Sequence, residues 1–241
     1  MSRPRVALSW SSGKDSAWTL HRLRQDPDIE VAVLVTTVNE EFNRVAMHAV
    51  RQELLHAQAE AAGLPLIEVP IPYPCSNADY ESRMRALIER LRGERIERMA
   101  FGDLYLADIR AYREQQLQGT GIAPLFPLWN EPTAALARSM IAGGLRAVLT
   151  CVDPKRLAAE FCGRQFDAAL LDALPAGVDP CGENGEFHSF ACAGPMFRAP
   201  IAIETGETVE RDGFVFTDLR RTRDGSDEMT EPARDGFSKQ L

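Results

Sequence analysis

The sequence predicts an α/β protein built around a mostly parallel sheet with flanking helices, because short apolar segments alternate with helical segments along its first half. Val6 to Trp10 is a short apolar run, and Val31 to Val38 is an uninterrupted run rich in β-branched residues, as expected for a parallel strand that helices cover on both faces. Ser16 to Leu23, between them, has the spacing of a helix. Polar residues follow the first strand directly, where parallel sheets bind their ligands.

The next elements continue this alternation. Val45 to Ala62 is rich in Ala, Leu, Gln and Glu and stops at Gly63, which predicts a helix closed by a glycine. A strand is expected at Leu66 to Ile71, a helix at Ala78 to Leu91 and a strand at Met99 to Gly102. Parallel strands separated by helices are joined by right-handed crossovers, so these strands should form one sheet.

The character of the chain changes after Asp103, where three prolines interrupt the pattern around Ile122 to Asn130. We therefore predict a nucleotide-binding domain at 1–103, a smaller α/β domain at 104–220 and a polar, flexible tail at 221–241. In the second domain we expect helices and strands at the following segments: helices at Asp108 to Leu117, Thr133 to Ile141 and Phe166 to Leu174, and strands at Ala147 to Val152 and Phe214 to Thr217.

Composition excludes several classes of protein. The 241 residues include 27 basic and 35 acidic ones, a net charge of −8 that argues against nucleic acid as the partner. Five cysteines without framework spacing indicate free thiols in a reducing compartment. No long apolar run or signal-peptide core is present, so we expect a cytoplasmic protein with no membrane association. The sequence leaves a homo-oligomer open.

The hexapeptide Ser11 to Ser16 has the features of a phosphate-binding loop. A strand that turns directly into a helix presents backbone N–H groups and the helix N-terminus to one point, where anions bind. Gly13 allows close approach of a phosphate, Lys14 supplies a cation, and the serine hydroxyls supply donors.

Asp15 requires a separate explanation, because a carboxylate beside a triphosphate is repelled unless a cation lies between them. We therefore expect Asp15 to bind Mg²⁺, directly or through water. The alternative for the whole loop is a polar turn in which Ser11 or Ser12 caps the following helix.

The loop resembles the Ser-Gly-Gly-x-Asp-Ser pattern of the PP-loop ATP pyrophosphatase superfamily and departs from it only at Ser12. The resemblance implies a HUP-like, Rossmann-type nucleotide domain that cleaves ATP to AMP and pyrophosphate, usually after a substrate oxygen attacks the α-phosphate. ATP should lie at the carboxyl ends of the strands, with the adenine near Thr36 and Thr37.

Further segments resemble the diphthine-ammonia ligase (diphthamide synthase) family, over about Val6 to Pro200. These segments are Met47-His48, Phe101-Gly102-Asp103 followed by Asp108-Ile109-Arg110 and Tyr112, Pro127-Leu128-Trp129, residues 179–189 (Asp-Pro-Cys-Gly-Glu-Asn-Gly-Glu-Phe-His-Ser) and Gly194-Pro195-Met196-Phe197. The family commonly has Thr at the position of Ser189, and its Tyr-Gln-Arg-x-Arg stretch is poorly reproduced here. We expect His48, Gly102 and Asp103 to line the nucleotide pocket.

Glu183 and Glu186 are the candidate acceptor-site residues. They are three apart and flanked by glycines, so both carboxylates can turn into one cleft, bind a cationic substrate or ammonia, and accept a proton. The trimethylammonium group of diphthine would suit such a pocket if Phe187 or Trp129 offered a ring face. The alternative is a solvated polar turn.

The resemblance implies an ATP-dependent ligase that adenylates a carboxylate, such as that of diphthine on an elongation factor, and lets ammonia displace AMP. Three alternatives remain: an adenine nucleotide α-hydrolase acting on another substrate, a tRNA thiolase, and a non-catalytic AMP or ATP sensor. Two further alternatives concern Cys181, as a zinc ligand with His188 and Cys192 or as a nucleophile activated by His188.

Overall fold

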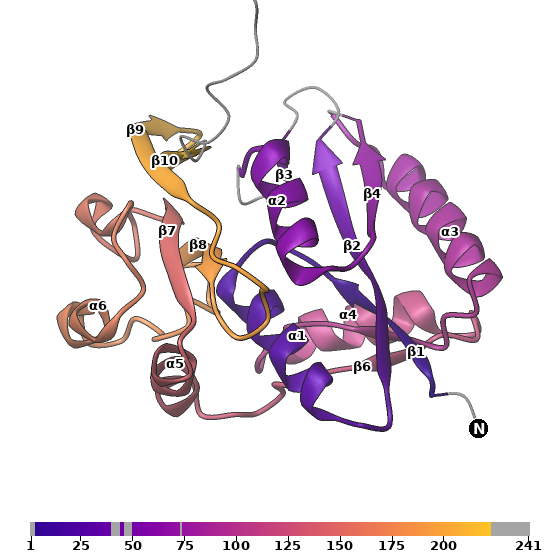
Figure 1. The fold of residues 1–241 in the computed structure, drawn as a ribbon. Helices are drawn as coiled ribbons and strands as arrows, with labels where there is room; N and C mark the ends of the chain where they lie inside the picture. The colour runs from indigo at the N-terminus through magenta and orange to yellow at the C-terminus, as the bar shows by residue number, and fades with distance from the viewer. Residues whose placement is uncertain (1–2, 40–43, 46–49, 73, 223–241) are drawn as a thin grey trace, which may run out of the picture.

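The computed structural model describes residues 3–39, 44–45, 50–72 and 74–222, which form two sheets with flanking helices (Figure 1). In the first sheet, five parallel strands run in the order β4-β2-β1-β5-β6, and the short β3 is antiparallel to β2. The predicted parallel α/β sheet is confirmed. Its strands are β1 (Arg5–Ser9), β2 (Glu30–Asn39), β3 (Arg44–Val45), β4 (Leu66–Ile71), β5 (Arg98–Ala100) and β6 (Ala123–Leu125).

Helices cover both faces of this sheet, as the uninterrupted apolar strands require. Neighbouring residues of β1 belong to different hydrophobic clusters: Leu8 packs with residues of α1 and α2, whereas Ala7 packs with residues of α3 and α4. The carboxyl ends of the strands are left open for a ligand. The helices are α1 (Lys14–Gln25), α2 (Gln52–Ala62), α3 (Asn77–Gly93) and α4 (Ala107–Leu117).

The second sheet is antiparallel, in the order β8-β7-β10-β9, and lies to one side of the first sheet, against α1 (Figure 1). Both regions contribute to one hydrophobic cluster, which includes Leu8 and Leu20 from the first and Leu149 and Phe190 from the second. The elements here are α5 (Thr133–Ala142), β7 (Arg146–Val152), the 3-10 turn η1 (Ala159–Phe161), α6 (Ala168–Ala173), β8 (Phe187–Ala193), β9 (Ile203–Arg211) and β10 (Phe214–Arg221).

Two sequence expectations need correction. The helix expected from Val45 begins only at Gln52, because Val45 lies in β3, paired with Val38. Its predicted end is confirmed: Gly63 is left-handed, with φ of 64°, and closes α2. The helix expected from Phe166 begins at Ala168, since the Asp167 side chain accepts the Leu170 N–H as an N-cap.

The boundary expected near residue 104 stays a prediction. Sheet pairing carries the first sheet beyond that point, because β6 pairs with β5. Of the expected tail, only Arg221 and Thr222 lie within the described residues. Among the helices of the described part of the chain, none combines the length and apolar character of a membrane span.

Candidate functional site

Residues 11–16 form the end of the connection after β1 and the first turn of α1, at the carboxyl edge of the first sheet, and β8 of the second sheet packs against α1. Ser12 is left-handed, with φ of 68°, and buried. Its carbonyl accepts hydrogen bonds from Ala191 N (2.9 Å) and Gln58 Nε2 (3.0 Å). The Lys14 N–H donates to Ser189 Oγ at 3.2 Å. The second sheet therefore fixes the shape of the loop.

Gln58 is a buried amide on α2 that links three parts of the chain. Besides Ser12, it donates to the Ala191 carbonyl (2.7 Å) and accepts the Trp10 indole N–H (2.9 Å). Both sides of the amide are thus satisfied by the end of β1, the loop and β8. Gln58 holds the loop in its strained conformation against both sheets.

Lys14 is almost completely buried, with 2% of its side chain exposed. Its ammonium lies 2.8 Å from Asp15 Oδ2, donates to the Cys181 carbonyl, and sits 5.2 Å from the centre of the Phe187 ring. Burial lowers the pKa of Lys14, but Asp15, Cys181 and Glu183 outweigh it and raise the pKa overall. Lys14 therefore stays charged at neutral pH.

A polar cavity of about 240 Å³ opens above the loop. Ser11, Gly13, Lys14, Asp15 and Ser16 line it from the loop, Gly102 and Asp103 from the end of β5, and residues 181–183, 185 and 187–189 from the second region. The structure thus brings most of the sequence-predicted site residues together. Ser12 is an exception, because its side chain is buried behind the loop.

Two carboxylate oxygens on this cavity are buried without a hydrogen-bond partner among the described residues: Asp15 Oδ1 and Asp103 Oδ2. The second lies 3.6 Å from Arg113 Nε as an ion pair. Burial raises the pKa of both carboxyls, against the opposing effect of Lys14 and Arg113. Mg²⁺ is typically held by one or two carboxylates together with substrate phosphates, and this donor set fits it.

The glutamates of the 179–189 turn have different surroundings. Glu183 lines the cavity, and its Oε1 accepts the Leu104 N–H at 2.8 Å. Burial raises its pKa to about 7. Glu186, 3% exposed, instead accepts hydrogen bonds from Asp179 N, Asn184 N and Asn184 Nδ2 at 3.0–3.1 Å. Only Glu183 faces the cavity, whereas Glu186 holds the turn that carries it.

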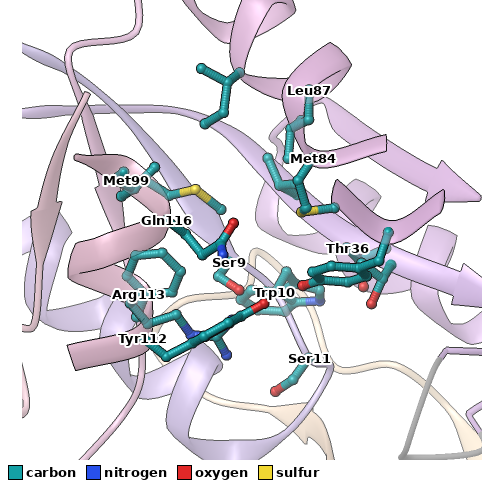
Figure 2. A pocket seen from close by; sticks show the side chains of 16 residues that line it. Ser9, Trp10, Ser11, Thr36, Met84, Leu87, Met99, Tyr112, Arg113 and Gln116 are labelled. Atoms are coloured by element: carbon teal, nitrogen blue, oxygen red, sulfur yellow. The ribbon is translucent and has the colours of Figure 1, made fainter. Parts of the chain in front are cut away.

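A second, mostly apolar cavity of about 390 Å³ adjoins the first (Figure 2). Thr36 and Thr37 at the end of β2 line it, as the sequence analysis expected for the adenine site. Two helices form other walls of this cavity, and of these residues only Tyr112 was singled out from the sequence: Tyr80, Met84, Leu87 and Ile88 of α3 and Tyr112, Arg113, Gln116 and Leu117 of α4. Amphipathic spacing on a helix does not separate such residues from core. His48 lies outside the described residues.

Comparison of the chain with models of protein families identifies its family. Residues 4–124 match the diphthamide synthase N-terminal domain, and residues 132–223 match the diphthamide synthase C-terminal domain. The chain belongs to the diphthamide synthase family. Family membership thus covers both the sheet that carries the loop and the sheet that packs against it.

Two diphthine–ammonia ligases are similar to this chain over most of their length. The diphthine–ammonia ligase of Rattus norvegicus is 26% identical over 241 residues, covering 91% of this chain and 90% of that protein. The diphthine–ammonia ligase of Danio rerio is 26% identical over 252 residues, covering 94% and 98%. A solved structure of the U34-tRNA thiolase NcsA from Methanococcus maripaludis, with its [4Fe-4S] cluster, matches with a TM-score of 0.38 at 17% identity, covering 59% of this chain and 58% of that one.

The cysteine and histidine of the family's glycine-rich turn offer no nucleophile and no zinc site. Cys181 is buried, its thiol donates to the Thr133 carbonyl, and burial raises its pKa far above neutral. Burial lowers the pKa of His188 to about 4, so its ring is neutral. Within the described ranges, no group of three or more His, Cys, Asp or Glu is placed to hold a metal ion.

Replacing Gln58 by Met is expected to lower the free energy of unfolding by at least about 2 kcal/mol, because it leaves the buried Trp10 N–H and Ala191 carbonyl without these partners. It should also weaken binding of ATP more than binding of adenosine, since the loop loses its support. Urea unfolding and calorimetry measure both. Gln25→Met, at an exposed position of α1, is the control. A Gln58→Met protein as stable as the control would contradict this role.

Replacing Glu186 by Gln is expected to cost about 1–3 kcal/mol of unfolding free energy, because one carboxylate oxygen that accepts a backbone N–H becomes an amide donor. ATP affinity should change little, since Glu186 does not line either cavity. Thermal unfolding and nucleotide titration provide the comparison, with the exposed Glu89→Gln as control. Unchanged stability together with lost turnover would instead mean that Glu186 takes part directly in the reaction.

Proposed function

We propose that the protein is an ATP-dependent amide ligase that adenylates a carboxylate and lets ammonia displace AMP. The observation that carries this proposal is the buried Lys14 ammonium in a carboxylate-lined cavity that adjoins a second cavity with the size and character of a nucleoside site. Membership of the diphthamide synthase family supports the same chemistry.

ATP would occupy both cavities. The adenosine suits the apolar one, whose volume of about 390 Å³ lies within the range of small-ligand pockets and whose walls combine ring and methionine side chains with Thr36 and Thr37. The triphosphate suits the polar one, where the Ser11 and Ser16 hydroxyls, Lys14 and the N-terminus of α1 meet. This arrangement leaves the α-phosphate between the two cavities.

The reaction then has two steps. An oxygen of the acceptor carboxylate attacks the α-phosphorus, the bond from that phosphorus to the bridging oxygen breaks, and pyrophosphate leaves with the electron pair. Ammonia next attacks the acyl carbon, and AMP leaves with the oxygen that came from the carboxylate. Lys14 neutralises charge on the phosphates from a water-poor position, where its effect is greatest.

Glu183 would remove the proton of the incoming ammonium. It lines the cavity that holds the reacting phosphate, and a pKa of about 7 suits a base at neutral pH. Mg²⁺ held by Asp15, with Asp103 nearby, would offset the phosphate charge.

The proposal also covers the acceptor substrate and the cellular compartment. The relatives are named for diphthine, so we propose diphthine on an elongation factor as the acceptor. Its trimethylammonium group would find a carboxylate at Glu183. A cytoplasmic setting fits the five cysteines, all of which are free.

The test is a screen of pyrophosphate release from ATP with ammonium present and diphthine-bearing elongation factor or small carboxylates as acceptors. If the protein is a ligase, pyrophosphate release from ATP should depend on the acceptor, and AMP should form in an equal amount. Release that is the same without any acceptor would favour the α-hydrolase, and absence of release would favour the nucleotide sensor.

A further inference from the structure

Arg113 occupies the boundary between the two cavities. Four residues line both of them: Ser9, Ser11, Phe101 and Arg113. Arg113 is the charged one of these four. Figure 2 shows it entering from α4 on the same side as Tyr112 and Gln116, opposite Met84 and Leu87 of α3. A ligand that spans both cavities must pass this guanidinium.

The surroundings of Arg113 fix its position without using all of its donors. Its Cζ lies 5.0 Å from the centre of the Phe101 ring, which supports one face of the guanidinium. Its Nε is buried and has no hydrogen-bond partner among the described residues, since Asp103 Oδ2 is an ion-pair partner at 3.6 Å. The Arg113 side chain as a whole is 31% exposed, so an anionic ligand in the cavities would meet its exposed part and not the buried Nε.

Arg110, one turn earlier on α4, provides an internal comparison. Its guanidinium also lies over aromatic rings, 4.8 Å from the centres of both Phe126 and Trp129, but its Nε donates to Glu114 Oε1 at 2.8 Å. Arg110 lines neither cavity. The two arginines therefore share helix, charge and aromatic support, and they differ in access to the site.

We propose that Arg113 binds the α-phosphate of ATP and stabilises the negative charge that develops there during adenylation. The inference rests on the proposed placement of ATP, because the group that joins adenosine to the outer phosphates is the α-phosphate. An arginine suits this task, since its planar fork donates to two phosphate oxygens at once and remains charged at any physiological pH.

The same position favours the reaction. As the carboxylate oxygen attacks, two anions meet at the α-phosphorus, and a guanidinium beside that atom reduces their repulsion. Lys14, 99 positions earlier in the sequence, lines the polar cavity alone, whereas Arg113 lines both cavities, so the two cations would act on different phosphates.

The test compares adenosine with AMP, which differ by the α-phosphate alone. We expect wild-type protein to bind AMP more tightly than adenosine in calorimetric titrations. Arg113→Met should lower AMP affinity about tenfold to a hundredfold, as loss of a charge-assisted contact predicts, and change adenosine affinity much less. Arg113→Lys, which keeps the charge without the fork, should lose less. Arg110→Met is the matched control and should leave both affinities unchanged.

Several results would overturn the inference. Equal weakening of adenosine and AMP by Arg113→Met would assign the residue to cavity shape, and no change in either would show no nucleotide contact. Unchanged AMP binding with a raised KM for the acceptor would assign Arg113 to the acceptor carboxylate. If AMP selectivity depends on Arg113 but no acceptor supports pyrophosphate release, the ligase proposal fails while the Arg113 assignment stands.

Discussion

Replacing Lys14 by Met is expected to lower kcat for AMP formation by on the order of 10² or more, because the phosphates lose the cation buried beneath them. The variant should also be less stable. Asp15 would lose its 2.8 Å partner while staying largely enclosed, and breaking a buried pair in this way costs about 3–5 kcal/mol. Because Asp15 retains some exposure, we expect the lower end of that range.

The double variant Lys14→Met with Asp15→Asn separates the two effects. Removing both charges should restore much of the stability that the single change loses, since no unpaired charge remains. It should not restore turnover, because both the cation and the candidate Mg²⁺ ligand are gone. Lys155→Met, at an exposed position, is the control for the substitution itself. Turnover equal to the wild type in a folded Lys14→Met protein would refute the assignment of the loop.

Replacing Glu183 by Gln is expected to lower ammonia-dependent AMP formation about 10²- to 10⁴-fold at pH 8, the usual contribution of a general base. The ionisation of Glu183 sets the direction in which the rate changes with pH. Glu183 accepts a proton only when ionised, and its pKa is raised to about 7, so the wild-type rate should rise with pH through this value. The variant, measured at the same fixed concentration of ammonium as the wild type, should lack the step near this pH.

Hydroxylamine provides the control for Glu183, because it is largely neutral near pH 7 and has no proton to lose before it attacks. Glu183→Gln should therefore be impaired far less with hydroxylamine than with ammonium, while Glu89→Gln should behave as wild type with both. Equal loss with both nucleophiles would mean that Glu183 acts in adenylation, or in holding the Leu104 N–H, and not as the base.

The first sheet and its loop could be predicted from the sequence because their signals are local. Uninterrupted apolar strands such as Val31 to Val38 have one physical explanation, a position between two layers of helices, and the polar residues after β1 then have to lie at the open edge. Gly63 likewise carries its own signal, because a left-handed residue at the end of a helix favours glycine.

Two strands of the second sheet were predicted, since Ala147 to Val152 and Phe214 to Thr217 lie in β7 and β10, but β8 and β9 gave no comparable signal. In β8, His188 and Ser189 interrupt the apolar residues, and the strand is placed by pairing with β7 and packing against α1. For the same reason the sequence could not show that Gln58, in the middle of an ordinary helix, meets both Ser12 and Ala191. Long-range contacts of this kind have no spacing rule.

Local sequence patterns also could not assign the separate roles of Gly13, Glu183 and Glu186 within the site. Gly13 was expected to let a phosphate approach, and its Cβ position also lies only 3.2 Å from the Ser189 carbonyl, so the packing of β8 requires a small residue there too. Glu183 and Glu186 look equivalent in sequence, but backbone N–H groups of the turn take up one carboxylate and leave the other on the cavity.

The central claim is that a carboxylate oxygen, and not water, attacks the α-phosphorus of ATP. The most direct measurement supplies diphthine-bearing elongation factor labelled with ¹⁸O in the acceptor carboxylate, together with ATP and ammonium in unlabelled water, and analyses the AMP by mass spectrometry. We expect one ¹⁸O atom in each AMP and an unlabelled pyrophosphate. Unlabelled AMP, or ADP with free phosphate as the products, would contradict it.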